Sequence, residues 1–349
     1  MPTLTVDPRR PGRRLIPVCA GLFSAVAGFF ALTALGVGGG GGPASPPAAA
    51  SAGARALTAL QAYSQEAARR EGLGNTAGAR PVSELVPVPP AAFDRPIAES
   101  RIHAEAELRA MALDVHRLIG QLALGDRARS RAIWLSAYGR YLRLGAVYGE
   151  FGELDTAIDG SAGGLAGGPA NPGFTGLHRI EFGLWTNQDP RGLETAARVL
   201  ATNIRRLEKL VPTVAITPLD YATRAHEILE DAQRDFLSGA DVPWSGEGVF
   251  ATATGLAATE QVLDTLRPLL DGRESVIEQV DYGLSRLRTV LAEVRLAHAG
   301  RWPALAELSQ LESERLDGAL GFALEQLAGV PGDLETQLPP AIPALGGRR

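Results

Sequence analysis

The 349-residue chain has little cysteine, lysine or aromatic content, and each shortage excludes a class of protein. A single cysteine, Cys19, excludes a scaffold stapled by disulfides. Aromatic residues make up 6% of the chain, which disfavours β-strands, where they are enriched. Lys209 is the only lysine among 34 basic residues, and 39 acidic residues outnumber them. The sequence therefore lacks the clustered basic surface of a nucleic-acid-binding protein, and no nucleic-acid partner is expected.

The motifs of nucleophilic and phosphate chemistry are also missing. The chain contains no G-x-S-x-G nucleophile elbow, and no Walker-type or Rossmann glycine pattern stands before a helical segment. The glycine run 38–42 belongs to a Gly/Pro/Ala/Ser stretch that is typical of a tether. Hydrophobic residues at 45% and charged residues at 21% are nevertheless ordinary for a globular protein. We therefore expect a folded body of one large domain or two fused ones.

The amino-terminal region has the pattern of an export signal or membrane anchor. Residues 1–14 are basic, and residues 15–37 form an apolar run long enough to cross a bilayer. The basic cluster predicts that the amino terminus stays in the cytoplasm while the body is exported to the extracytoplasmic face of the membrane. The body is then either anchored through residues 15–37 or released by cleavage, and residues 38–54 form the tether.

Helical periodicity dominates the rest of the chain. Apolar residues approximate a stripe at Ile97, Ile102, Leu108, Leu113, Leu118 and Leu122. Further helical segments are predicted at 190–211, 217–238, 248–270, 273–299 and 303–329, separated by Gly- and Pro-containing breaks. The pattern predicts an all-α fold over residues 55–330, with residues 331–349 as a flexible tail.

The segment 173–185 is the most unusual part of the chain. A Gly- and Pro-rich loop leads to Thr175, which is a candidate N-cap for a short helix. His178 and Glu181 are three residues apart, so they share one face of that helix. An imidazole nitrogen and a carboxylate on one face can bind a divalent cation when neighbouring helices complete the shell. The same pair is also compatible with an ordinary ion pair at the edge of the core.

Two other groups of polar residues are weaker candidates. His226 and Glu230 lie one helical turn apart and are compatible with either a ligand pair or a solvated face. Glu153, Asp155 and Asp159 precede the Gly-rich loop, where they either ligate a hard cation or cap helix ends. The remaining histidines, His103, His116 and His298, lack a comparable acidic motif and are interpreted as surface or packing residues.

The segment that contains Gly176, His178 and Glu181 resembles the G-x-H-x-x-E signature of imelysin-like proteins, most closely those of the EfeO type, which serve bacterial ferrous-iron uptake. Leu184-Trp185 follows it as in that family. Stretches within 141–159, 224–230 and 266–270 support the resemblance, which extends over roughly residues 85–330.

The resemblance implies two antiparallel four-helix bundles, at about residues 85–210 and 211–330, that face each other across a cleft. It also implies a metal site at the cleft, with His178 and Glu181 from the signature, Asp155 from the preceding helix and Glu230 from a later one. The implied metal is iron, as ferrous or ferric ion, with zinc or manganese as alternatives. The implied partners are the iron permease and the haem peroxidase of an Efe-type system.

The sequence departs from the family pattern in two respects. Relatives carry glutamates where residues 141–145 stand here, and an acidic or polar cluster where residues 248–252 stand. These losses predict a site that is assembled differently or is weaker. A cupredoxin-like domain, which some EfeO proteins carry, is not expected in this chain, and we therefore expect no copper-dependent oxidation of iron by the chain alone.

Three functions are compatible with the sequence. The leading one is an exported metal-binding protein that captures iron in the cleft and delivers it to a membrane permease. The second is a metal-dependent peptidase of the imelysin type with Glu181 as ligand or base. Because the motif holds only one histidine and no separate base is evident, we do not expect an enzyme. The third is a ligand-binding scaffold whose metal site has decayed.

Overall fold

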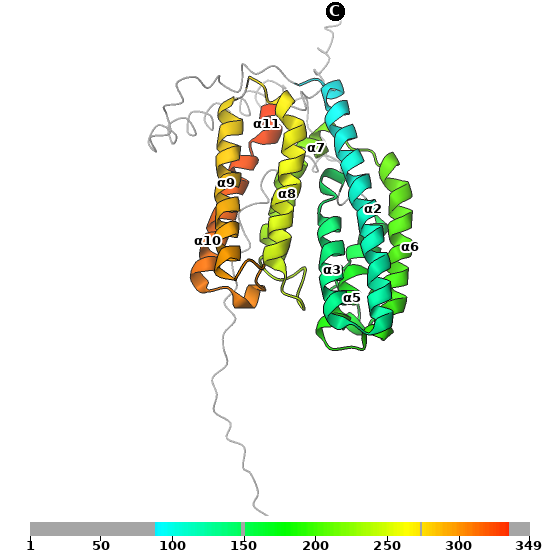
Figure 1. The fold of residues 1–349 in the computed structure, drawn as a ribbon. Coiled ribbons are helices and arrows are strands. Elements are labelled where there is room, and N and C mark those ends of the chain that lie inside the picture. The colour runs from blue at the N-terminus through cyan, green and yellow to red at the C-terminus, as the bar shows by residue number, and fades with distance from the viewer. Residues whose placement is uncertain (1–87, 148–150, 273, 335–349) are drawn as a thin grey trace, which may run out of the picture. The chain divides into compact units, whose positions relative to one another are not determined.

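The computed structural model describes residues 88–147, 151–272 and 274–334. Within these residues the chain forms helices and no strand, which confirms the predicted all-α class for this part of the protein (Figure 1). The predicted segments 1–14, 15–37 and 38–54 lie outside the described residues. Among the helices that the structure describes, none has both the length and the apolar character needed to cross a bilayer.

Ten α-helices are found in the described part of the chain, joined by short 3-10 turns and one π turn. The longer helices are α2 (Asp94–Leu124), α3 (Arg127–Leu142), α6 (Glu194–Leu210), α7 (Pro218–Asp231), α8 (Gly248–Leu266), α9 (Glu274–Ala297) and α10 (Gln310–Leu327). The shorter ones are α4 (Glu153–Asp159), α5 (Gly176–Trp185) and α11 (Val330–Leu334). The turns are η2 (Pro90–Phe93), η3 (Gly145–Val147), η4 (Gly168–Ala170), η5 (Pro190–Leu193), η6 (Val211–Thr213), η7 (Ala232–Phe236), η8 (Arg267–Leu269) and η9 (Leu305–Glu307).

Side-chain caps fix several helix starts. Asp126 accepts a hydrogen bond from the backbone N–H of Arg129 and begins α3. Thr217 and Asp220 form a reciprocal capping box at α7, and Ser309 and Glu312 form one at α10. These local signals explain why the helix starts are close to the breaks in the sequence pattern.

The buried face of α2 differs from the predicted stripe. Ile102 and Leu113 are 65% and 60% exposed, so their assignment to the core is wrong. The residues of α2 that lie in the core are spaced by three or four: Ala104, Leu108, Met111, Val115, Leu118 and Leu122. The residues of the predicted stripe are mostly five positions apart. In a helix with 3.6 residues per turn, a side chain five positions further along points well away from the first one. The predicted stripe therefore combined residues from the buried face and the exposed face of α2.

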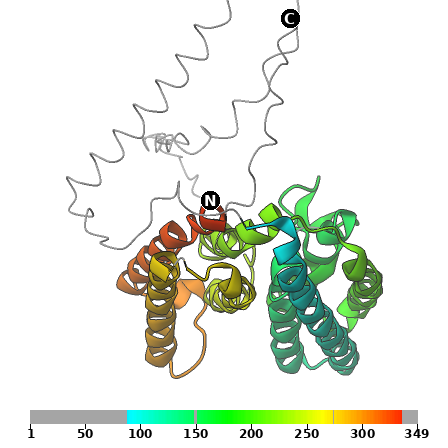
Figure 2. The same ribbon diagram turned by 90° about the horizontal axis from the view of Figure 1, so that it is seen from above.

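The helices pack in two groups that are joined through α8. Helix α2 packs on α3 and α6, and α5 contacts α3 and α6, while α7 packs on α8 and α9 on α10. Figures 1 and 2 show α2, α3, α5 and α6 on one side and α8, α9 and α10 on the other. Helix α8 also contacts α2 and α3. Because the packing crosses between the groups in this way, two four-helix bundles across a cleft stay a prediction.

The described chain closes on itself near its two ends. The backbone N–H of Val88 donates to the carbonyl of Leu334 at 3.2 Å. Both Val330 and Leu334 of α11 are buried, and α11 packs on α7. Ordered helix thus continues past residue 331, where the flexible tail was predicted to begin.

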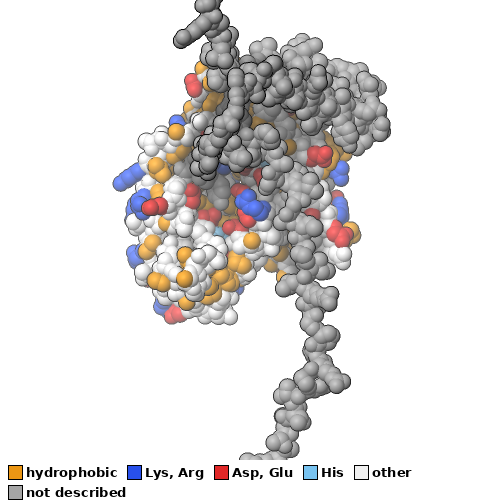
Figure 3. All heavy atoms as spheres, turned by 180° about the vertical axis from the view of Figure 1, so that it is seen from behind, with side chains coloured by type: hydrophobic (Ala, Val, Ile, Leu, Met, Phe, Trp, Pro, Cys, Tyr) orange, Lys and Arg blue, Asp and Glu red, His pale blue; other side chains and the backbone are white. Residues whose placement is uncertain are grey.

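Charged side chains are interspersed on the surface, as the face drawn in Figure 3 shows. The pairs Arg267–Asp281 and Arg301–Glu307 have closest N···O distances of 2.7 Å, and their side chains are 40% to 56% exposed. Ion pairs this exposed contribute about 0 to 1 kcal/mol each. The stability of the fold therefore depends mainly on its apolar core.

The two faces of α2 can be tested with a matched pair of truncations. Leu108→Ala removes a fully buried side chain and is expected to lower the free energy of unfolding by about 2–5 kcal/mol. Leu113→Ala removes a side chain that is 60% exposed and is expected to change it by about 0.5 kcal/mol or less. Urea unfolding of both variants measures the difference, and equal losses would contradict the assigned core face.

Candidate metal centre

Helix α5 presents the residues of the G-x-H-x-x-E segment to the interior. His178 is 1% exposed and Glu181 is fully buried. The apolar residues Leu177, Ile180 and Leu184 are buried on the same short helix, so its packing fixes the direction of both polar side chains. Thr175 occupies the N-cap position as predicted, but its hydroxyl donates to the carbonyl of Ala157 at 3.2 Å instead of capping α5.

Gly176 allows the start of α5 to approach the end of α4. Its φ is +81°, which glycine adopts without strain. A Cβ at this position would lie 2.2 Å from the carbonyl oxygen of Ile158, so no side chain fits. Asp159, the last residue of α4, follows Ile158 directly. The glycine of the signature thus has a physical role, because it places Asp159 beside His178.

Glu181 is held by hydrogen bonds on both carboxylate oxygens. Its Oε2 lies 3.0 Å from Nδ1 of His178. Its Oε1 accepts from the backbone N–H of Trp244 at 3.2 Å and from both the backbone N–H and the hydroxyl of Ser245 at 2.8 Å. A carboxylate on one ring nitrogen of a histidine fixes the tautomer and orientation, which leaves the other nitrogen as the ligand atom. Glu181 therefore orients His178.

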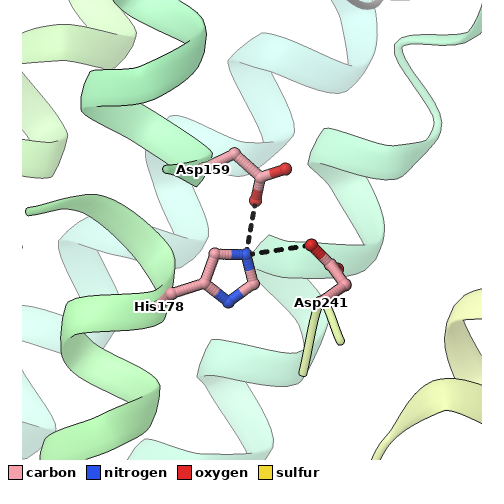
Figure 4. Close-up of side chains that lie close together, drawn as sticks. All are labelled: Asp159, His178 and Asp241. Atoms are coloured by element: carbon pink, nitrogen blue, oxygen red, sulfur yellow. Dashed lines mark ion pairs between the residues drawn. The ribbon is translucent and has the colours of Figure 1, made fainter. Parts of the chain in front are cut away.

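The other ring nitrogen, Nε2 of His178, points between two aspartates. It lies 3.2 Å from Oδ1 of Asp159 and 3.4 Å from Oδ1 of Asp241, as Figure 4 shows. One ligand atom from each of the three residues lies within 4.8 Å of the others. One imidazole nitrogen and two carboxylates form a donor set that suits a divalent transition metal.

Asp241 belongs to the loop between η7 and α8. The hydroxyl of Tyr138 in α3 donates to its Oδ2, and its own backbone N–H donates to the carbonyl of Asp235 at 3.1 Å. The side chain of Asp241 is 18% exposed, compared with 8% for Asp159 and 1% for His178. Solvent thus reaches the three residues mainly from the side of Asp241.

The three carboxylates around His178 control its protonation. Burial alone lowers the pKa of His178, but the charge of Asp159 and hydrogen bonds to Asp159, Asp241 and Glu181 raise it well above 6.5. For Asp241, burial raises the pKa, yet the hydrogen bond and charge of His178 and the hydrogen bond from Tyr138 bring the net pKa below 3.8. The raised pKa therefore favours the protonated form of His178 in the metal-free protein.

Two of the four predicted ligands lie elsewhere in the described structure. Asp155 is in the first turn of α4, where its Oδ2 accepts from the backbone N–H of Phe151 at 3.0 Å and its Oδ1 from the hydroxyl of Tyr141 at 3.3 Å. Glu230 is on α7, 3.6 Å from Nδ1 of His226, with 52% of its side chain exposed. Neither belongs to the cluster around His178. Glu181 lies against Nδ1 of His178 and is not among the three grouped residues, so Glu181, Asp155 and Glu230 as metal ligands stay predictions.

The positions that lack the family carboxylates have structural uses here. Within residues 141–145, where the resemblance led us to expect glutamates, Tyr141 donates its hydroxyl to Asp155. At Gly248, a Cβ would lie 2.2 Å from the carbonyl oxygen of Phe236, so this helix start has no room for an acidic side chain. The residues of the candidate metal centre therefore come from α4, α5 and the loop before α8.

In the sequence, Asp159 was one of three acidic candidates but was not selected as a metal ligand, and Asp241 was not considered. Asp159 is four residues after Asp155, and only the approach of α4 to α5 shows which of the two reaches His178. Asp241 lies 63 residues after His178, in a segment interpreted only as a break between two helices. The only signal for it in the sequence is that an acidic residue stands in a loop that contains Gly and Pro. His298, interpreted as a packing residue without an acidic motif, has its Nε2 3.2 Å from Oε1 of Glu312.

Curated relatives provide an independent comparison. "Iron uptake system component EfeO" from Escherichia coli strain K12 is 24% identical over 240 residues, which cover 68% of this chain and 64% of the relative. Proteins of the same name from Shigella flexneri and Shigella boydii serotype 4 match at 24% and 23% with similar coverage. The chain is similar to EfeO. These relatives confirm the resemblance read from the G-x-H-x-x-E segment.

The match to EfeO is partial in length. The chain spans somewhat less than two thirds of the length of the EfeO relatives. No protein-family model matches the chain.

Proton release can test whether Nε2 of His178 is the ligand atom. Because the raised pKa keeps His178 protonated at pH 7, binding of Zn²⁺ is expected to release about one proton per ion and to weaken as the pH falls. Calorimetric titrations in two buffers of different ionisation enthalpy measure this number. His178→Gln should abolish the release, whereas His226→Gln should leave it unchanged. Zinc binding by the unaltered protein without proton release would contradict the assignment.

The same raised pKa makes a prediction for the metal-free protein. A group whose pKa is raised by folding stabilises the native state below its unfolded pKa, and this contribution is lost as the pH rises through the folded value. His178→Gln is therefore expected to destabilise the metal-free protein more at pH 6 than at a pH above the raised value. Urea unfolding at several pH values measures the trend, and an equal loss at every pH would argue against a charged His178.

Proposed function

We propose that this protein is an exported metal-binding component of an iron uptake system, with iron as its cargo. The observation that carries the proposal is the position of Nε2 of His178 between Oδ1 of Asp159 and Oδ1 of Asp241, with Nδ1 held by Glu181. The name of the relatives, a component of an iron uptake system, supports the choice of cargo.

The donor set suits ferrous or ferric ion. Imidazole and carboxylate ligands accept iron, zinc and manganese, and the absence of a thiolate disfavours softer ions such as Cu(I). Three protein ligands leave further coordination positions for water or for groups of a receiving protein. Because Asp241 is the most exposed ligand, the ion would enter and leave on its side. A cargo site with one ligand nearer the surface than the other two suits capture followed by transfer.

Glu181 supports binding over hydrolysis. A metallopeptidase needs a base with an available lone pair beside the metal-bound water. Both oxygens of Glu181 already accept hydrogen bonds, three of them from the segment 244–245. Using Glu181 as the base would break this network, so we infer a binding protein and not an enzyme.

Export and delivery complete the proposal. The basic residues 1–14 and the apolar run 15–37 support passage across a membrane, followed by anchoring or release. The receiving partners would be an iron permease and a haem peroxidase, as the EfeO resemblance implies. Transfer to them requires an ion that is bound reversibly, which a cluster of three ligands provides more readily than a closed site.

Metal titration of variants tests the cluster. Anaerobic calorimetry with Fe²⁺, and parallel runs with Zn²⁺ and Mn²⁺, should show one ion bound per chain. His178→Ala, Asp159→Asn and Asp241→Asn are each expected to weaken binding at least tenfold, about 1.4 kcal/mol or more, because each removes one ligand. Glu181→Gln should weaken it less, because it removes no ligand and alters only how His178 and the loop that carries Asp241 are held.

Glu230→Gln and Asp155→Asn are the matched controls. If the cluster alone binds the ion, Glu230→Gln leaves the affinity unchanged, because Glu230 is 52% exposed beside His226. Asp155→Asn is expected to lower thermal stability through the start of α4 without a tenfold loss of affinity. Unchanged affinity in all three ligand variants would reject the site, and a tenfold loss in Glu230→Gln would restore the ligand set predicted from the sequence.

A further inference from the structure

A second cavity lies beside the metal centre but opens on another face of α5. It has a volume of about 540 Å³ and is lined by the loop 169–172 together with Phe174, Arg179, Phe182 and Gln188. This volume is within the range typical of sites for small organic molecules. His178 and Arg179 are neighbours on α5, so their side chains diverge by about 100°. The metal centre and this cavity are therefore separate sites.

Arg179 is the only charged residue of this cavity lining and has no counter-ion there. Its side chain is half-buried, and its Nη1 is buried without a hydrogen-bond partner among the described residues. Burial lowers the pKa of Arg179, which shows that its charge is poorly solvated. By contrast, Arg127 and Arg131 donate to the carbonyl of Leu184 at the other end of α5. A half-buried guanidinium with one buried and unpartnered nitrogen favours the binding of an anion beside it.

The walls around Arg179 are aromatic and held in place. The rings of Phe174 and Phe182 lie 6.4 Å apart, and the ring of Trp244 lies 5.9 and 5.1 Å from them. The guanidinium carbon of Arg179 lies 5.9 Å from the ring centre of Phe182. Asn171 fixes the opposite loop, donating to the carbonyl of Ala166 and accepting from the N–H of Gly173, both at 2.7 Å. The cavity is thus formed before any ligand arrives.

A comparison with another large cavity shows how the cavity at Arg179 differs. That cavity, of about 450 Å³ between α8 and α9, also contains arginines. Its Arg288 is paired with Glu260, and Nε of Arg295 donates to the carbonyl of Gly300 at 2.7 Å. Arg288 thus has a counter-ion and Nε of Arg295 has an acceptor, whereas Nη1 of Arg179 has no hydrogen-bond partner among the described residues and its cavity lining holds no acidic residue.

We propose that the cavity at Arg179 binds a small aromatic carboxylate. The carboxylate would accept two parallel hydrogen bonds from the guanidinium, the geometry in which arginine recognises carboxylates. The ring would pack on Phe174 and Phe182 in an offset or edge-on arrangement. This site does not depend on the proposed metal binding, because no ligand of the metal centre lines it.

Benzoate is the probe for this proposal. Calorimetry should detect benzoate binding to the unaltered protein, and Arg179→Gln should weaken it at least tenfold because the counter-charge is lost. Arg109→Gln is the matched control: it removes a guanidinium that is 63% exposed on α2 and does not line the cavity, so binding should persist. Acetate and benzyl alcohol should both bind more weakly than benzoate, since the first lacks the ring and the second the charge.

Thermal unfolding keeps the test independent of folding defects. Without ligand, Arg179→Gln is expected to melt no lower than the unaltered protein, because it removes an unpaired charge from a partly buried position. Saturating benzoate should raise the melting temperature of the unaltered protein and of His178→Ala, but not that of Arg179→Gln. The response of His178→Ala separates this proposal from the metal centre, because that variant should lose metal binding, and its melting temperature, whatever its starting value, should still rise with benzoate.

Three results would overturn the proposal. The first is that the unaltered protein does not bind benzoate even at concentrations on the order of 10 mM, because a dissociation constant above that range means that the cavity does not recognise benzoate. The second is equal affinity in Arg179→Gln and the unaltered protein. The third is equal binding of benzyl alcohol and benzoate, which would make the cavity an apolar pocket without a role for Arg179.

Discussion

The hydrogen bonds on Glu181 are the interaction on which the metal centre depends. One carboxylate joins α5 to the segment 244–245, through three donors on one oxygen and His178 on the other. A fully buried carboxylate is costly unless its lone pairs are satisfied, and here both oxygens have partners. The same bonds orient His178 and hold the loop that carries Asp241. Loss of the network would therefore disturb two of the three candidate ligands together.

Close packing between short elements brings the third ligand into place. Gly176 lets α5 approach the end of α4, so that Asp159 faces Nε2 of His178. Tyr138 of α3 then donates to Asp241 from the opposite side. Four segments far apart in the sequence thus converge on one imidazole. Each of these contacts is common in proteins, and the candidate site forms because all of them occur around the same imidazole.

The loop before α8 connects the metal centre with the cavity at Arg179. Trp244 donates its backbone N–H to Glu181, while its ring packs on Phe174 and Phe182 at the cavity wall. Both sites therefore use the same short helix and the same loop, although their polar groups face different ways. A short helix can serve two sites in this manner because adjacent residues point in directions about 100° apart.

The sequence by itself determined the helical class, the approximate positions of five of the longer helices, and the placement of His178 and Glu181 on one helical face, because these depend on periodicity, on Gly- and Pro-containing breaks, and on residues three positions apart. It did not determine which face of α2 is buried, since Ile102 and Leu113 fit a loose apolar pattern as well as Leu108 does. Only the tertiary structure decided that Asp159 and Asp241, and not Asp155 or Glu230, lie against His178. Those contacts depend on a glycine-permitted approach of two helices and on a loop 63 residues away, and neither leaves a periodic signal in the sequence.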